Sequence, residues 1–172
     1  KLKNHPMASA SFHDFTEGNS FALALRRDGK TLGGVTAQLI DLGNDPLSQH
    51  VKQSYKRIYG GNSVDVVAAA HPAMEAISGR IVYQGELFIH ESLRGLGSVS
   101  ALTMYLHHSW SFQRWRAKRV YGFIREADVL RGKAAQYGFL NAYPGAIKWR
   151  SIPQGRVEGE YMVTITEKEF LQ

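Results

Sequence analysis

The chain has 172 residues, enough for one well-packed domain and too few for two ordinary ones. Hydrophobic residues (44%) and charged residues (21%) stand in globular proportions, which excludes disorder, and the lack of cysteine excludes disulfides, thiolate metal ligands and a cysteine nucleophile. The formal net charge of +6 favours an anionic partner, and because the cations are scattered along the chain we favour a phosphorylated cofactor over nucleic acid.

Two strands joined by a tight turn are predicted near the start of the chain, at 21–27 and 31–41. Asp28 and Gly29 lie between these apolar runs, and glycine accepts the positive φ that such a turn requires. The sequence therefore predicts a β-hairpin, which ends at the turn-forming residues 43–46.

A helix is predicted to start at Pro46, with Asp45 as its N-cap. Its apolar residues follow at helical spacing, at Leu47, Val51, Tyr55 and Ile58. The stretch 63–78 is ambiguous, because its alanine-rich run favours a helix whereas Pro72 favours a break or a new start. We interpret about 43–79 as a helical insertion within a single domain that spans 1–172.

The second half of the chain alternates strands and helices. We predict a long strand at 80–90, bulged at Gly85, then a helix at about 98–115, a strand at 119–124, a helix at 126–137, and strands at about 146–152 and 161–166. The predicted apolar face of helix 98–115 consists of Val99, Leu102, Leu106 and Trp110. A strand joined through a helix to the next strand makes a parallel pair, so the fold class is α+β, with an otherwise mostly antiparallel sheet.

The most informative stretch is the end of the long strand and the loop that follows it. Gly95 and Gly97 let the backbone turn sharply and approach a ligand closely. The helix that follows leaves its first backbone amides without intrahelical partners, and this end of a helix carries a partial positive charge. The glycines and these amides together can bind a phosphate group. The guanidinium of Arg94 can add a bidentate contact to phosphate oxygens. Taken alone, these residues favour a plain strand-to-helix turn without a ligand.

Three segments, however, resemble the GNAT superfamily of acyl-CoA-dependent N-acyltransferases. Residues 89–99 resemble its motif V-x-P-x-x-R-G-x-G-x-G/A, with Glu91 in place of the proline and Val99 in place of the last small residue. Residues 134–139 resemble its second landmark, Y-x-x-x-G-F, and the hairpin at 21–42 resembles its second and third strands. The chain is thus identified as a divergent member.

The resemblance implies a twisted sheet whose parallel strands, 80–90 and 119–125, splay apart to admit the pantetheine arm of acetyl-CoA or another acyl-CoA. The strand backbone would pair with the pantetheine amides. The loop amides would hold the pyrophosphate, and no metal is expected. The residues implied to bind the co-substrate are Phe88, Ile89, Arg94, Gly95, Leu96, Gly97, Ser98 and Val99.

The reaction implied is acyl transfer, most simply acetyl transfer, to a primary amine on a small molecule or a peptide. The alternative is a non-catalytic module of the same fold that binds acyl-CoA or an acyl carrier as a sensor. A nucleic-acid-binding domain is a third hypothesis, which the scattered charge disfavours.

Acyl transfer to an amine needs a base for the ammonium and an acid for the leaving thiolate. Glu86 on the long strand is the first candidate base, and His90, which simple alternation places on the same strand face, is the second. The family's helix tyrosine falls at Ala134, so Tyr137, about one turn further, is the candidate acid, with Tyr143 as a fallback. Each also has a structural interpretation, as a solvated carboxylate, a surface histidine or a packing aromatic.

Several other residues invite a functional interpretation. His107 and His108 point about 100° apart on one helix and are interpreted as structural. Three residues of the insertion are candidates for an acceptor pocket, although solvated helices are favoured there: Tyr55, Tyr59 and His71. We assign a further aromatic group to the core or to a homodimer surface: Trp110, Phe112 and Trp115.

The sequence also predicts a cytoplasmic location. Its longest apolar runs, such as 66–70, are too short to span a bilayer. Residues 1–7 lack the apolar core of a secretory signal.

Overall fold

The computed structural model describes residues 9–172, and its main body is a six-stranded sheet. The first eight residues, on which the judgement about a secretory signal depends, lie outside the described residues. The strands are β1 Ser20–Arg27, β2 Lys30–Asp41, β4 Arg80–Ile89, β5 Arg119–Ile124, β6 Asn141–Tyr143 and β8 Tyr161–Thr166. They lie in the order β1-β2-β4-β5-β8-β6, and a separate two-stranded sheet consists of β3 Val67–Ala70 and β7 Ile147–Trp149.

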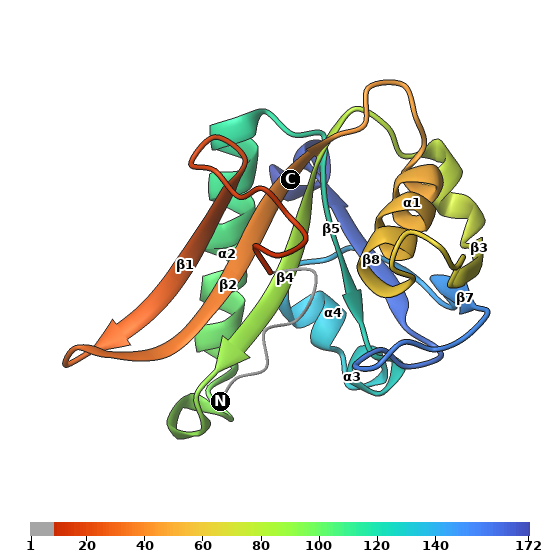
Figure 1. Ribbon diagram of the computed structural model, residues 1–172. Coiled ribbons are helices and arrows are strands. Elements are labelled where there is room, and N and C mark those ends of the chain that lie inside the picture. The colour runs from red at the N-terminus through yellow and green to blue at the C-terminus, as the bar shows by residue number, and fades with distance from the viewer. Residues whose placement is uncertain (1–8) are drawn as a thin grey trace.

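Helices cover both faces of the main sheet (Figure 1). The long helix α2, Gly97–Trp115, packs on the face that carries Val35 and Val82, and α1, Leu47–Tyr59, packs on the face that carries Ile81. The shorter helices are α3 Glu126–Leu130, α4 Lys133–Gln136 and α5 Glu167–Phe170, with single turns η2 Pro72–Ala76 and η3 Glu91–Leu93. None of the described helices is long and apolar enough to cross a membrane.

The predicted hairpin is confirmed. β1 and β2 pair antiparallel around Asp28 and Gly29, whose φ values are 50° and 73°. Positive φ at both central residues is the turn geometry that matches the twist of the flanking strands, and an Asp-Gly pair adopts it readily.

The predicted parallel pair is also confirmed, and it splays apart. β4 and β5 pair only from Ile81 with Arg119 to Tyr83 with Tyr121. Beyond that point β4 continues along β2 whereas β5 continues along β8. Beyond Tyr83, the edge of β4 that faces β5 therefore forms no ladder with that strand.

β4 is bulged close to the predicted place. Thr36 of β2 pairs with Gly85, but Gly34 pairs with Phe88, so β4 carries one extra residue between them. Glu86, rather than Gly85, takes the left-handed backbone conformation, with a φ of 51°. The bulge is tied to β2 by the Thr36 hydroxyl, which donates to the Gly85 carbonyl at 3.0 Å.

The segment between β2 and β4 contains α1, β3 and η2. Helix α1 buries the four apolar residues expected from their spacing, but its predicted cap is wrong. The N-cap residue is Pro46, and the Leu47 amide donates to the Ile77 carbonyl at 2.8 Å, so backbone rather than the Asp45 side chain closes this end. The ambiguous stretch contains β3 and a short 3₁₀ turn that Pro72 begins.

Helix α2 buries a different face from the one predicted. Leu102, Leu106 and Trp110 are 59%, 49% and 48% exposed. The buried face is mixed in character and consists of Ser100, Thr103, Met104, His107, His108, Ser111, Phe112 and Trp115. This face carries small residues and two histidines that bond to backbone carbonyls outside the helix, so the apolar pattern alone indicated the wrong side. Phe112 and Trp115 are core residues, whereas Trp110 lies on the outer face.

The C-terminal third differs from prediction in three places. The single helix expected at 126–137 is two helices, α3 and α4, because Gly132 between them has a φ of 77°. The strand expected at 146–152 is the shorter β7, which pairs with β3 instead of joining the main sheet. Strand β6 and helix α5 were not predicted, although Thr166 and Glu169 form a capping box that is readable in the sequence.

Candidate functional site

The loop between β4 and α2 presents open backbone amides. Within the described chain, the amides of Gly95, Gly97 and Ser98 donate no hydrogen bond, whereas those of Leu96 and Val99 bond to backbone carbonyls. Gly95 has a φ of 89°, which explains the need for glycine there. Helix α2 is 19 residues long and begins at Gly97, so its partly positive end lies at these three amides. Three of the five predicted phosphate-binding amides are thus open.

A pocket of about 360 Å³ lies beside this loop. Its wall combines the end of β4, the loop itself and helix α4, and it includes Leu87, Ile89, Arg94, Gly95, Leu96, Gly97, Lys133, Gln136 and Tyr137. Lys133 donates to the Gln136 side chain at 2.8 Å, and Gln136 donates to the Gly97 carbonyl at 3.0 Å. Arg94 and Lys133 together make this an anion-attracting pocket. Lys133 and Gln136 were missed because no pattern in the sequence links α4 to the loop.

A second pocket of about 360 Å³ adjoins the first, since Leu87 and Tyr137 line both. It lies where β4 and β5 diverge. Its polar lining consists of Gln84, Glu86, Arg125, Asp128, Arg156 and Glu160. Two of the predicted catalytic residues, Glu86 and Tyr137, are therefore brought together on one cavity, here called the bulge pocket.

Both residues have altered acidity. Glu86 is an exposed residue that lines the bulge pocket, and loss of hydration beside the surrounding protein raises the pKa of its carboxyl above the ordinary value. Partial burial, together with the Asp128 carboxylate, raises the pKa of the Tyr137 phenol. A phenol whose pKa is at or above its ordinary value is protonated near neutral pH, which is the state that a proton donor requires.

His90 lies apart from these two residues. It is the first residue beyond β4, and its Nδ1 accepts a hydrogen bond from the Ser92 amide at 3.2 Å, so it caps η3. It lines neither of the two pockets. The extra residue at the bulge interrupts the alternation from which a common face with Glu86 was expected.

The candidates in the insertion also lie elsewhere. Tyr55 is buried in the core, and the Tyr59 hydroxyl is buried and makes no well-formed hydrogen bond in the described part of the chain. His71 caps η2 through a bond from the Ala73 amide at 3.1 Å, and its ring contacts that of Tyr143. None of these residues lines the bulge pocket.

His107 and His108 connect two sides of the site. His107 Nε2 lies 3.3 Å from the carbonyl of Thr36, opposite the bulge, and His108 Nε2 lies 2.9 Å from the carbonyl of Tyr137. Burial lowers the pKa of His107 to about 3 and that of His108 to about 4, so both rings are neutral near pH 7. Among the described residues, no group of three or more His, Cys, Asp or Glu residues could hold a metal ion.

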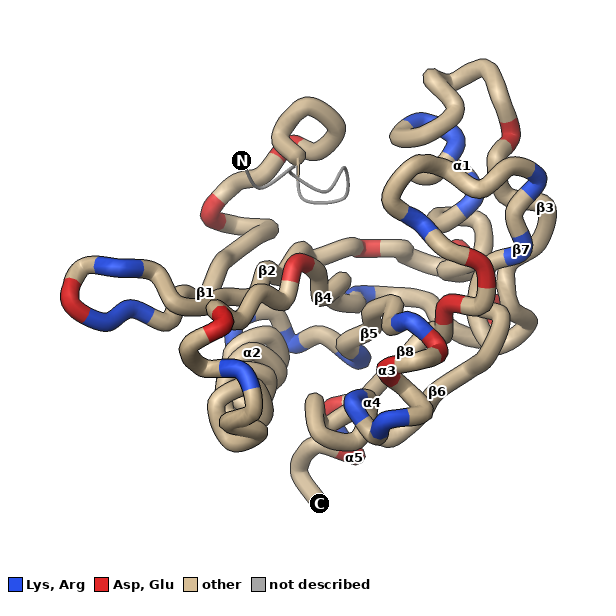
Figure 2. The backbone as a smooth tube through the Cα atoms, turned by 90° about the horizontal axis from the view of Figure 1, so that it is seen from below, with Lys and Arg blue, Asp and Glu red and all other residues tan. Residues whose placement is uncertain are grey.

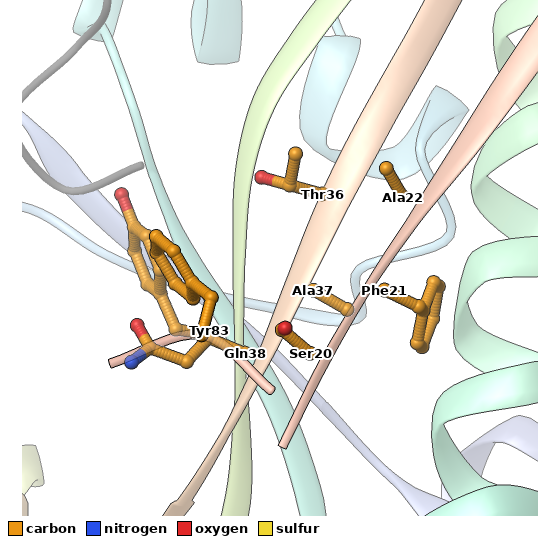
Figure 3. A pocket seen from close by; sticks show the side chains of 8 residues that line it. Ser20, Phe21, Ala22, Thr36, Ala37, Gln38 and Tyr83 are labelled. Atoms are coloured by element: carbon orange, nitrogen blue, oxygen red, sulfur yellow. The ribbon is translucent and has the colours of Figure 1, made fainter. Parts of the chain in front are cut away.

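A third pocket, of about 250 Å³, lies on the sheet face over β1 and β2. Figure 3 shows its lining, in which Thr36 and Tyr83 come from neighbouring strands and Phe21 from β1. Tyr83 also lines the bulge pocket, so the two pockets adjoin. Within residues 9–172, charged positions are scattered over the hairpin, α1 and the α3–α4 region, and they do not gather on one element (Figure 2).

No protein-family model matches the chain, and neither does any curated protein. Solved structures do match. RimJ of Mycobacterium smegmatis, in complex with CoA-disulfide, is 16% identical, with 90% of this chain and 56% of that chain covered and a TM-score of 0.51. A chimera of the spermidine N-acetyltransferase SpeG from Vibrio cholerae and hSSAT is 11% identical, with 91% and 72% covered and a TM-score of 0.51.

These matches extend over most of this chain. The matched region covers little more than half of the RimJ chain. At 11% and 16% identity they establish the fold rather than the activity. The mixed sheet, with its diverging parallel pair β4–β5, agrees with them. The resemblance seen in the sequence is thus confirmed at the level of architecture: the chain has the fold of the GNAT acetyltransferases.

Proposed function

We propose that this protein transfers an acyl group, most simply acetyl, from acyl-CoA to a primary amine. The observation that carries the proposal is the set of open amides at Gly95, Gly97 and Ser98, which Arg94 and Lys133 flank with positive charge. Such a helix end suits a pyrophosphate. The edge of β4 along which β5 no longer runs begins beside it and leads to the bulge pocket, which suits an extended pantetheine arm.

The chemistry follows from the groups that line the bulge pocket. The acceptor ammonium gives one proton to Glu86, directly or through water, and the free amine nitrogen attacks the thioester carbonyl. A C–N bond forms and the C–S bond breaks. Tyr137 protonates the leaving thiolate, and the second proton lost from nitrogen restores the phenol. The products are an amide, the free thiol of CoA and one proton. We place the donor for the carbonyl oxyanion among the backbone amides of the bulge.

Two further features belong to the proposal. The acceptor is an amine on a small molecule or a peptide, in keeping with the SpeG structure, which is described as a spermidine N-acetyltransferase. The absence of cysteine suits a reducing, cytoplasmic setting.

Ala134, which is buried under α2, stands where the family places its tyrosine, and this substitution keeps a non-catalytic binding module as the second candidate.

A matched pair of serine variants tests the loop. Ser98→Asp adds a carboxylate beside the open amides, where it also suits the helix end, so the fold should not suffer. Ser109→Asp makes the same change farther along the same helix. Titration calorimetry with CoA should give an affinity at least about tenfold weaker for Ser98→Asp and within about twofold of the original for Ser109→Asp. Unchanged CoA affinity in Ser98→Asp contradicts the loop assignment.

Turnover separates the two candidate functions. Release of CoA thiol from acetyl-CoA should appear with at least one amine of a mixed panel. CoA binding without thiol release would favour the binding module.

A further inference from the structure

Arg156 is a buried cation in the wall of the bulge pocket. Its side chain is only 3% exposed, although it belongs to the lining together with Glu86. Its guanidinium lies over three aromatic rings, at 5.3 Å from the ring centre of Tyr55, 5.2 Å from that of Phe123 and 5.6 Å from that of Trp149. Such a cage fixes the plane of the guanidinium.

The hydrogen-bonding capacity of Arg156 is only partly used. Nη2 lies 2.7 Å from Glu160 Oε2 and donates to the Tyr55 hydroxyl at 3.2 Å. Nε is buried and makes no well-formed hydrogen bond within the described residues, although the Tyr59 hydroxyl interacts with this guanidinium. A guanidinium offers five N–H donors, and leaving one of them buried and unsatisfied costs free energy. A guanidinium with donors that Glu160 and Tyr55 do not take, on a residue that lines a cavity, suits a ligand that brings an acceptor.

The neighbouring residues leave room for such a ligand. Gly155 also lines the bulge pocket, and a Cβ built there would meet nothing within 4 Å. Besides Arg156, the lining carries the carboxylates of Glu86 and Asp128. The pocket therefore offers both an anion-binding guanidinium and carboxylates that suit an ammonium group.

We propose that the amine acceptor carries a carboxylate close to its amine, as an amino acid does, and that Arg156 binds this carboxylate. The inference rests on the proposed acyl transfer and specifies its substrate class. The planar guanidinium matches a carboxylate, which can share Arg156 with Glu160. A diamine or polyamine would instead bring a second cation towards Arg156 and offer it no acceptor.

Pairs of amines that differ by one carboxylate test this directly. L-lysine and cadaverine form one pair, and L-phenylalanine and phenethylamine form another. Thiol release from acetyl-CoA gives kcat/KM for each amine, and calorimetry on the CoA-loaded protein gives its affinity. We expect the carboxylate-bearing member of at least one pair to exceed its partner tenfold or more in one of these two measures.

A pair of arginine variants tests whether Arg156 causes the preference for the amine that carries a carboxylate. Arg156→Lys keeps the charge and removes the planar fork, so the preference within a pair should fall towards one. Arg125→Lys changes an exposed arginine of the same pocket and should keep the preference. The preference is the ratio of the values for the two amines of a pair, measured on one preparation of the variant. A loss of folded protein lowers both values equally, so it does not change the ratio.

Two outcomes overturn the inference, and they differ from failure of the proposed function. If the decarboxylated amines equal or exceed their partners in both measures, the acceptor class is wrong while acyl transfer stands. If Arg156→Lys keeps the full preference, another group binds the carboxylate. Absence of both CoA binding and turnover instead defeats the proposed function itself, and the inference with it.

Discussion

Glu86 holds a backbone conformation that costs free energy, because its φ of 51° brings its Cβ close to the neighbouring carbonyl. The surrounding sheet maintains this conformation. Thr36 fixes the Gly85 carbonyl, and Phe88 resumes pairing with Gly34. The pairing of β2 with β4 thus fixes the bulge, and the fixed bulge holds Glu86 in the lining of the bulge pocket.

Replacing Glu86 tests its role as the base. Glu86→Gln should lower kcat about 100-fold, the scale typical of general-base catalysis, while the affinity for CoA stays within about twofold. Because burial raises the pKa of this carboxyl, wild-type activity should fall as the pH drops through a value above 4.5, and the variant should lack this limb. Steady-state rates between pH 5 and pH 9 measure both effects.

The control is Glu91→Gln, which removes an exposed carboxylate of η3 that lines neither pocket. It should leave kcat and the pH profile as they are. A Glu86→Gln enzyme with an unaltered profile would exclude this residue as the base.

At the scale of elements, helix α2 has two tasks. Its first turn presents the open amides, and its middle places His107 and His108 between β2 and the Tyr137 turn. Each carbonyl can only accept, so each Nε2 carries a hydrogen and donates it. One helix thus connects the open loop amides, the bulge and the candidate acid.

Two variants of His108 test whether this connection positions Tyr137. His108→Phe keeps a ring beside Phe139 but removes the bond to the Tyr137 carbonyl, so kcat should fall about tenfold. His108→Gln retains a side-chain donor and should recover most of that loss. The affinity for CoA should change little in either variant. Equal kcat values for the two variants, at equal thermal stability, would contradict a positioning role.

At the scale of the whole molecule, three histidines make the fold sensitive to acid: His107 and His108 are buried, and His50 is partly buried. Burial lowers the pKa of His107 to about 3 and those of His50 and His108 to about 4, and for His50 the charge of Arg57 contributes as well. In the unfolded chain these rings titrate near pH 6.5. Between about pH 6.5 and 4 the unfolded state therefore binds more protons, so stability falls as the pH falls.

Urea unfolding at pH 7, 6 and 5 measures this effect. Each of the three rings should cost up to about 2 kcal/mol of unfolding free energy between pH 6.5 and pH 5. The double variant His107→Gln with His108→Gln keeps both donors and cannot titrate, so its stability should depend less on pH. Equal stability of the original protein at pH 7 and pH 5 would refute the assignment of neutral buried rings.

The sequence by itself determined the features that neighbouring residues control. The Asp28–Gly29 pair accepts positive φ and closes the hairpin. Gly95 and Gly97 open the loop before a long helix, and a strand, a helix and a further strand in succession dictate a parallel pair. From these the fold class and the open loop amides could be predicted, because turn geometry and helix starts are local properties of the chain.

Only the tertiary structure decided which side chains share a cavity. Lys133, Arg156 and Glu160 join the loop and the bulge from segments distant in the sequence, and no local pattern marks them. The buried face of α2 carries two histidines that bond to the carbonyls of Thr36 and Tyr137, which are distant in the sequence, whereas Leu102 stays exposed. Likewise, a single extra residue at the bulge separated His90 from Glu86. The physical reason is that the propensity for a turn, helix or strand depends on residues that are neighbours in the sequence. Which faces of these elements pack together, and which side chains then share a cavity, depends on residues that are far apart in the sequence.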